Sequence, residues 1–208
     1  MKKGIITMFA FASLFIVACG GGETEEVVVD EVVAENAIYY ADVNASEVNW
    51  RGEVAGVYGH EGYVNLQSGM IEMAGDEIIG GEFAVDMSAF YPTDTASYKD
   101  VDGGRITDLQ NHLTQEDFFA SATYPVATFQ VTEVNGKALT GELTVRGKTS
   151  TETFNITKLE KTMNGISMSG TLVFDRQKYD VAWVHFMKDM ILSDDISIKV
   201  NLLASTKL

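Results

Sequence analysis

The chain has three histidines, whose imidazoles can bind metals or transfer protons. They lie far apart in the sequence, at His60, His112 and His185. None belongs to a His-x-x-His or His-Glu-x-x-His pattern, which would place metal-binding groups next to one another on one helix face. His60 follows Gly59, where we expect a turn, and His112 falls in a segment with helical spacing. We therefore predict hydrogen-bonded structural histidines and no metal site.

Acidic pairs and nucleophiles offer little more for catalysis. Glu116-Asp117 and Asp194-Asp195 are adjacent in the sequence and are typical of turns or solvated surfaces. Asp194-Asp195 also has the oxygen ligands that calcium prefers, but the sequence does not identify the remaining ligands. The chain has no Gly-x-Ser-x-Gly motif and no glycine-rich phosphate loop. We predict a protein that is not an enzyme, with no catalytic residue.

Two arginines end predicted strands, Arg146 in the segment LTVRG and Arg176 in FDR. We expect both to form surface or rim ion pairs, which contribute about 0–1 kcal/mol each. The alternative is that a rim arginine meets the polar head of a ligand.

The N-terminus has the features of an export signal. Lys2 and Lys3 precede an uncharged apolar run, residues 4–17, that is shorter than the about 20 residues of a membrane span. The run ends in Ile16-Val17-Ala18-Cys19, which resembles a bacterial lipobox and implies cleavage before Cys19 and lipidation of its sulfur. The alternative is a plain secretory signal in which Cys19 is incidental. Cys19 is the only cysteine, so the chain has no internal disulfide.

The sequence divides into three parts. Residues 1–18 form the predicted lipoprotein signal peptide, residues 19–37 a lipidated cysteine with an acidic, flexible tether, and residues 38–208 one folded domain. The tether segment VVVDEVVAE has a second interpretation, as a short edge strand or helix. The formal net charge of −15 argues against nucleic acid and anionic lipid headgroups as partners.

Alternation of apolar and polar residues dominates the folded domain, which indicates half-buried strands. Turn signals such as Asn135-Gly136 and Asn164-Gly165 separate the alternating runs. About eight antiparallel strands in sequence order, joined by tight turns, predict an all-β, up-and-down barrel, since closure removes the exposed sheet edges.

One segment has helical spacing instead. Ile106, Leu109 and Leu113 predict a short helix over about residues 103–113 that caps the barrel, with Asp102 near its N-terminal cap. Phe118 and Phe119 follow, and Pro125 then forces an extended conformation on Tyr124. We expect one phenylalanine ring to pack the helix on the barrel mouth and the other to line the cavity entrance.

The apolar pattern leaves open whether the barrel is hollow. A barrel of about eight strands can be filled by side chains or can hold one small ligand. Gly52, Gly141 and Gly170 fall on the inner face, where they either leave space beside larger residues or mark bulges and bends.

Several motifs together resemble the YceI-like family. They are SEVNWRGEVAGVYGHEGYVNLQSGMI (46–71), GGEFAVDMSAF (80–90), LQNHLTQEDFFASATYPVATFQVTEV (109–134), LTGELTVRGKTSTETFNI (139–156) and FDRQKYDV (174–181). The resemblance covers the chain from about Ile38 to its end. It implies a lipocalin-like barrel that binds polyisoprenoids in a secreted or lipid-anchored protein.

The sequence and this resemblance together predict a protein that binds, sequesters or carries a long-chain apolar lipid, isoprenoid or quinone-like, at the bacterial cell envelope. Gly20 after Cys19 favours the outer membrane. No cofactor is expected besides the bound lipid. The alternative is a barrel with a filled core that acts as a stress-response or protein-interaction module. The candidate ligand-binding residues are Trp50, Phe83, Phe118, Phe119, Phe129, Leu143, Met168 and Phe174.

Overall fold

The computed structural model describes residues 35–54, 58–182 and 192–206. Its elements are β1 (Asn36–Ala41), β2 (Glu47–Val54), β3 (Tyr58–Ala74), β4 (Glu77–Pro92), η1 (Thr95–Ser97), α1 (Ile106–Thr114), β5 (Val126–Asn135), β6 (Ala138–Val145), β7 (Lys148–Thr162), β8 (Gly165–Asp175), η2 (Arg176–Tyr179) and β9 (Leu192–Ser205). The predicted signal peptide, Cys19, most of the predicted tether and His185 lie outside the described residues.

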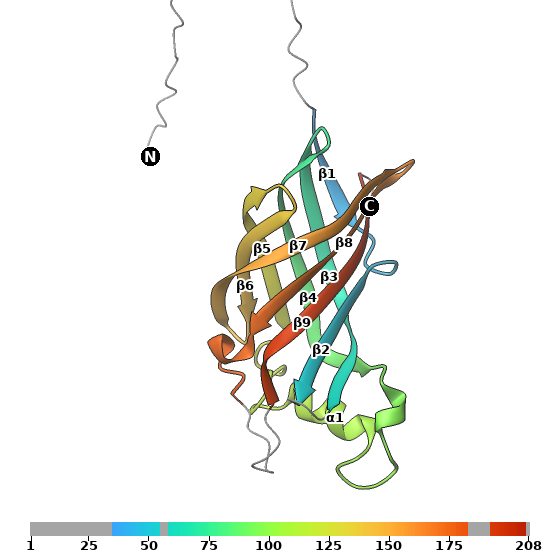
Figure 1. The fold of residues 1–208 in the computed structure, drawn as a ribbon, viewed down its shortest axis with the longest axis vertical. Coiled ribbons are helices and arrows are strands. Elements are labelled where there is room, and N and C mark those ends of the chain that lie inside the picture. Colours follow the sequence, from blue (N-terminus) through green and yellow to red (C-terminus); the bar gives the residue numbers. More distant parts are fainter. Residues whose placement is uncertain (1–34, 55–57, 183–191, 207–208) are drawn as a thin grey trace, which may run out of the picture. The chain divides into compact units, whose positions relative to one another are not determined.

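Eight strands close into an antiparallel barrel, which confirms the predicted fold (Figure 1). Each strand from β2 to β8 pairs with the next one along the chain, and β9 pairs with β2. β1 is additional: it pairs with the last residues of β3 and, at Tyr40 and Ala41, with the end of β9. β1 and β2 therefore both lie between β3 and β9. They pair with different residues of those two strands, and residues 42–46 connect them. β1 begins at Asn36, two residues before the expected start of the domain.

The predicted turns join long neighbouring strands. Gly75 and Gly136 have positive φ values of 61° and 58°, a conformation that glycine adopts without a steric penalty. Pro125 is followed directly by β5, as expected from its effect on the preceding residue.

The alternation predicted from the sequence is present in the structure. Along β8, Ile166, Met168, Leu172 and Phe174 are buried, whereas Thr171 between them is exposed. The inner faces of the strands therefore form one hydrophobic core inside the barrel.

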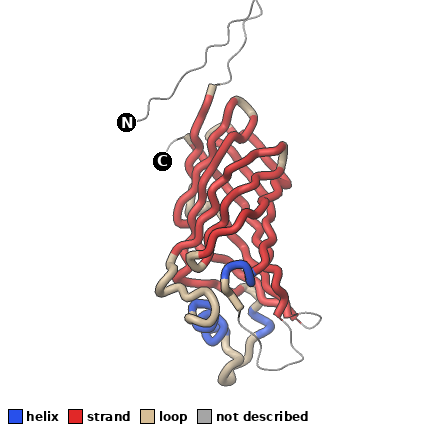
Figure 2. Tube along the Cα trace, turned by 90° about the vertical axis from the view of Figure 1, so that its left-hand side faces the viewer, coloured by secondary structure: helices blue, strands red, loops and turns tan. Residues whose placement is uncertain are grey.

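The end of the barrel away from α1 is solid. Ile71, Met73, Ile166 and Leu202 are almost completely inaccessible there, and none of them is among the residues that line the cavity described below. Helices and long loops gather at the opposite end of the barrel (Figure 2).

The capping helix starts later than predicted. α1 begins at Ile106, with Arg105 rather than Asp102 at its N-cap. Asp108 explains this start, because its carboxylate accepts a hydrogen bond of 2.9 Å from the backbone N–H of Arg105. Asp102 is exposed and lies 3.5 Å from the Arg105 guanidinium.

The three inner-face glycines all lie at register shifts between strands. In the pairing of β2 with β9, the shift comes directly after Gly52. The other two shifts lie on the neighbouring strands, in β5 directly after the residue that pairs with Gly141 and in β7 directly after the residue that pairs with Gly170. At Gly141 and Gly170 there is no free space, because an added Cβ would lie 2.8 Å from the Phe129 ring and 2.3 Å from the Phe154 ring, respectively. Gly52 differs, since its Cβ would meet only Ile196 Cδ1, at 3.4 Å. The bend interpretation holds for all three glycines, and free space remains only at Gly52.

Candidate ligand-binding cavity

A cavity of about 770 Å³ occupies the half of the barrel that α1 covers. This volume falls within the range of about 300–1,000 Å³ that is typical of small-molecule sites. Its wall consists mostly of apolar side chains from all eight strands of the closed barrel, β2 to β9, and from α1. The structure thus gives a divided barrel, filled at one end and hollow at the other.

All eight residues predicted to bind ligand lie on the wall of this cavity. They are Trp50, Phe83, Phe118, Phe119, Phe129, Leu143, Met168 and Phe174. Their placement agrees with the prediction, while their role in binding remains a prediction.

Phe118 and Phe119 both line the cavity and both pack against the scaffold. Phe118 is 5% exposed and Phe119 is 7% exposed, and the two rings meet edge to face at a centroid distance of 5.0 Å. Phe119 also stacks on Phe90 of β4 at 5.2 Å, and Phe118 meets the ring of His112 at 5.3 Å. The expected division, with one ring for packing and one for the cavity, is therefore wrong.

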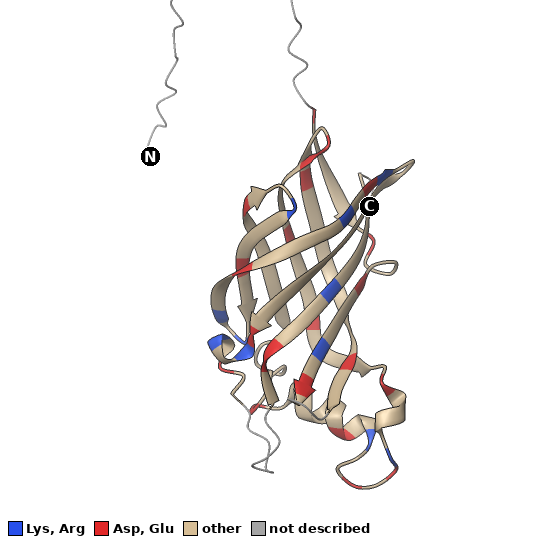
Figure 3. Ribbon diagram, viewed as in Figure 1, with Lys and Arg blue, Asp and Glu red and all other residues tan. Residues whose placement is uncertain are grey.

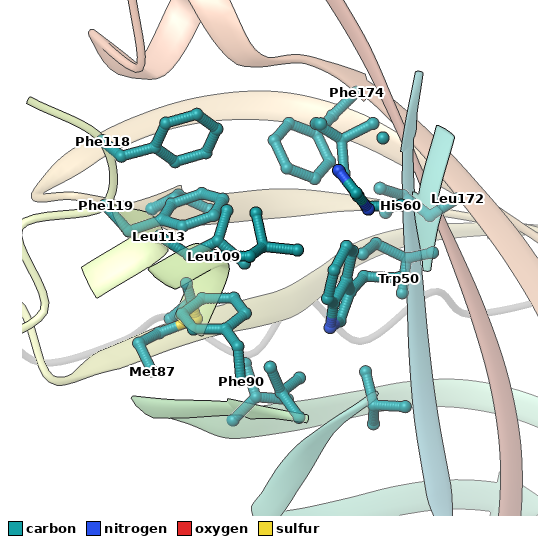
Figure 4. Close-up of a pocket in the computed structure, with 18 of the residues that line it drawn as sticks. Trp50, His60, Met87, Phe90, Leu109, Leu113, Phe118, Phe119, Leu172 and Phe174 are labelled. Carbon is teal, nitrogen blue, oxygen red and sulfur yellow. The ribbon is translucent and has the colours of Figure 1, made fainter. Parts of the chain in front are cut away.

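Backbone hydrogen bonds hold the turn that carries these two rings. Phe119 N–H donates to the Leu113 carbonyl at 3.2 Å, and Ala120 N–H donates to the Gln115 carbonyl at 2.8 Å. The turn thus continues directly from the end of α1. Figure 4 shows Phe118 and Phe119 with Leu109 and Leu113 on one side of the cavity, and Trp50 and His60 on the other.

Sequence reasoning missed a polar cluster at the wall, made by His60, Asp94 and Tyr98. His60 lies within β3 and not in the predicted turn. Its Nδ1 is 2.9 Å from Asp94 Oδ2, and Tyr98 OH donates to Asp94 Oδ1 at 2.9 Å. The Tyr98 ring stacks on the imidazole at 5.5 Å. The expectation of a hydrogen-bonded histidine is correct at His60, but no local motif links it to residues more than thirty positions away.

The protonation of this cluster follows from its contacts. Burial alone would raise the pKa of Asp94, but hydrogen bonds from His60 and Tyr98 outweigh it and lower that pKa. Burial and the bond to Asp94 raise the pKa of Tyr98, so its hydroxyl stays protonated. Asp94 is therefore a carboxylate that accepts from both partners, which requires a proton on His60 Nδ1.

A second histidine, His112 of α1, also lines the cavity. Burial lowers its pKa, against a smaller opposing effect of Asp117. The neutral imidazole is thereby favoured, as suits a mostly apolar wall.

Charged groups reach the cavity at the α1 end. Arg105 and Asp108 are on the wall, and Arg105 is exposed. Its guanidinium lies 2.8 Å from Asp100 and 3.5 Å from Asp102. Tyr58, also on the wall, is 40% exposed. The cavity therefore reaches the molecular surface beside these residues.

One buried donor on the wall has no hydrogen-bond partner among the described residues, namely the indole N–H of Trp50. The ring packs edge to face against Phe90, with centroids 6.1 Å apart. Since buried N–H groups are normally satisfied, a ligand with an acceptor oxygen suits this wall better than a pure hydrocarbon.

The two arginines do not line the cavity. Arg176 forms the expected ion pair, with Asp194 at 3.2 Å, but its predicted surface position is wrong. Only 3% of its side chain is exposed, and it donates to the backbone carbonyls of Val181, Leu192 and Ser193 as well as to Asp194. Arg146 donates to the carbonyls of Glu116 and Asp180. Both arginines therefore hold loops in place.

Nothing in the described segments assembles a metal centre. No group of three or more His, Cys, Asp or Glu side chains suitable for a metal ion occurs among the described residues. Asp194, proposed as part of a calcium site, accepts hydrogen bonds from Arg176 and Gln177. In the part of the chain described, none of the helices is long and apolar enough to span a membrane.

Comparison with known proteins agrees with this architecture. A UPF0312 protein of Staphylococcus epidermidis is 34% identical over 80 residues, or 36% of this chain and 47% of that protein, so the chain spans about half the length of that relative. BcnA of Burkholderia cenocepacia has a TM-score of 0.56 at 20% identity, covering 78% of this chain and 98% of that chain. A polyisoprenoid binding domain from Saccharophagus degradans, implicated in plant cell wall breakdown, has a TM-score of 0.54 at 14% identity, covering 83% and 98%. At these identities the two structures share the fold with this chain.

The motifs in the sequence and the barrel in the structure lead to the same family. The family model of the YceI-like domain matches residues 39–204, which is most of the chain and includes all strands of the closed barrel except the last residue of β9. The protein belongs to the YceI-like family.

Proposed function

We propose that this protein binds one long-chain apolar lipid, isoprenoid or quinone-like, inside its barrel and sequesters or carries it at the bacterial cell envelope. The observation that carries the proposal is the 770 Å³ cavity with its mostly apolar wall. Binding would be driven by removal of apolar surface from water, at about 25 cal/mol per Å² before the cost of ordering the ligand.

The chemistry of the wall supports a carrier rather than an enzyme. The described wall brings together aromatic and aliphatic side chains with a few polar groups at one end. The Saccharophagus degradans domain, which has the same fold, is described as polyisoprenoid binding. This description supports an isoprenoid as the ligand class here.

Attachment to the envelope is a second part of the proposal. Cys19 would carry the lipid anchor, and the acidic segment after it would act as a tether, with the outer membrane as the destination. Mass analysis of the mature N-terminus tests this, with Cys19→Ser as the variant. A wild-type chain that retains residues 1–18 or lacks acyl groups would contradict it.

Lipid uptake is tested by native mass spectrometry of the purified full chain, after organic extraction and addition of a polyprenol. We expect a one-to-one complex. Gly52→Leu should weaken it, because this position has room for a side chain that then projects into the cavity. Ser197→Leu is the matched control, since Ser197 is exposed on the outer face of β9. No co-purified lipid together with no uptake, or equal uptake by Gly52→Leu and wild type, would refute cavity binding.

A further inference from the structure

The polar cluster of His60, Asp94 and Tyr98 stands out against the otherwise apolar wall of the cavity. His60 and Tyr98 both line the cavity. Asp94 is not a lining residue, and its carboxylate contacts both of these side chains. All described hydrogen bonds of the imidazole are made by Nδ1. Nε2 is therefore the ring nitrogen that remains for a ligand.

The cluster is built to hold the ring in one orientation. Asp94 fixes Nδ1 at 2.9 Å, Tyr98 stacks on one face, and Tyr58 meets the ring edge to face at 5.2 Å. β3 places His60 on the inner face of the barrel opposite Gly52, while Trp50 lies on the same face of β2 opposite Gly62. The only inner-face neighbour on β2 directly opposite the imidazole is thus a glycine, which leaves room for a ligand group beside it.

The charges at this end of the cavity select against an anionic head. The cationic side chain on the described wall, Arg105, is already placed between two carboxylates, Asp100 and Asp102. Asp94 and Asp108 add further negative charge nearby. A phosphate or pyrophosphate would therefore be repelled by carboxylates without gaining an unpaired cation.

An uncharged hydroxyl fits the same position. With the proton on Nδ1 directed at Asp94, Nε2 of a neutral imidazole is an acceptor, and a ligand hydroxyl can donate to it. A carbonyl offers no donor to this nitrogen, and a hydrocarbon offers neither donor nor acceptor. Hydroxyl-bearing lipids include polyprenols and reduced, quinol-type heads.

We propose that His60, oriented by Asp94 and Tyr98, is the polar anchor of the cavity and selects long-chain lipids with a hydroxyl head over their hydrocarbon and pyrophosphate counterparts. This inference rests on the proposed lipid-binding function and specifies the head group that the site recognises.

The test compares three probes with the same chain: geranylgeraniol, the matching saturated or unsaturated hydrocarbon, and geranylgeranyl pyrophosphate. Competition against a fluorescent apolar probe in the purified full chain gives the three affinities. Wild type should prefer the alcohol over the hydrocarbon by about 3- to 10-fold, the contribution of one neutral hydrogen bond. His60→Leu should abolish this preference while it retains hydrocarbon binding.

Two further variants separate recognition from structure. In Asp94→Asn the amide N–H can donate to Nδ1, which moves the imidazole proton to Nε2 and should shift the preference toward geranylgeranial, the aldehyde. Tyr63→Leu, on the outer face of the same strand, is the control and should keep the wild-type order of affinities.

The outcomes are distinguishable. Equal affinity of wild type for alcohol and hydrocarbon, preference for the pyrophosphate, or an unchanged ratio in His60→Leu would overturn the head-group inference while lipid binding stands. Failure of every probe to bind would overturn both.

Discussion

Two glycines on the same inner face provide a direct test of where the barrel is hollow. A Cβ added at Gly170 would lie 2.3 Å from Phe154 Cζ and 2.6 Å from the Asn155 carbonyl oxygen, so both the ring and the backbone of β7 must move. Overpacking of this kind costs about 1–3 kcal/mol, and Gly170→Ala should fall at the upper end because a backbone atom is involved.

Gly52→Ala is the matched change on the cavity side. The nearest atom to its Cβ is Ile196 Cδ1 at 3.4 Å, an ordinary contact, and the loss of chain freedom in the unfolded state should stabilise the variant by about 0.4–1 kcal/mol. The two variants should thus differ by about 2–4 kcal/mol in free energy of unfolding. Urea denaturation monitored by circular dichroism measures this difference. Two values within about 0.5 kcal/mol of each other would refute the distinction between a filled position and a hollow one.

Three further changes probe other parts of the protein. Arg176→Met should lower the free energy of unfolding by about 2–4 kcal/mol, because buried backbone carbonyls lose their donor; a loss below about 0.5 kcal/mol in urea denaturation would contradict this. Tyr179→Phe should lower the free energy of unfolding by about 1 kcal/mol, because the Glu152 carboxylate loses the Tyr179 hydroxyl as a donor and keeps Lys178 Nζ, 3.0 Å from its Oε1; an unchanged free energy of unfolding would show that the hydroxyl bond is dispensable. At His112 the lowered pKa means that the folded state binds fewer protons than the unfolded state just below the ordinary value of 6.5. The free energy of unfolding should therefore decrease as the pH falls from about 6.5 to the pKa of His112 in the folded state. In His112→Leu the free energy of unfolding should depend less on pH over that range. A slope equal to that of the wild type would contradict the role of His112.

The helix and the aromatic pair show how far local spacing reaches. Leu109 and Leu113 were predicted to share one helix face, and both line the cavity. The predicted start of the helix is wrong because the actual start depends on a hydrogen bond that the backbone N–H of Arg105 donates to the Asp108 carboxylate, and apolar spacing does not reveal that bond. Phe118 and Phe119 were recognised as important, but the way each ring serves both packing and the cavity depends on Phe90, which β4 supplies from a distant part of the chain.

Arg176 and His60 show where local reasoning failed. Arg176 follows a strand end, which is normally exposed, yet it is buried at the first position of η2 and donates to the carbonyls of Val181 and of the start of β9. His60 follows a glycine that is typical of turns, yet its partners hold it inside a long strand. Apart from Val181, the hydrogen-bond partners named for these two side chains are more than fifteen residues away, so tertiary contacts override the propensity of the local segment.

By itself, the sequence determined which side chains face inward, because residue alternation on a strand is a local property, and it determined the meander of antiparallel strands through its turn signals. Only the tertiary structure decided that one half of the barrel is filled and the other is hollow. Filled and hollow barrels share the same alternation, and the difference depends on which side chains meet across the interior. Ile71, Met73, Ile166 and Leu202 fill the end away from α1. At Gly52, on the cavity wall, an added Cβ would meet only Ile196 Cδ1, at 3.4 Å. The polar cluster at the cavity wall likewise exists only after folding brings β3 and the loop after β4 together.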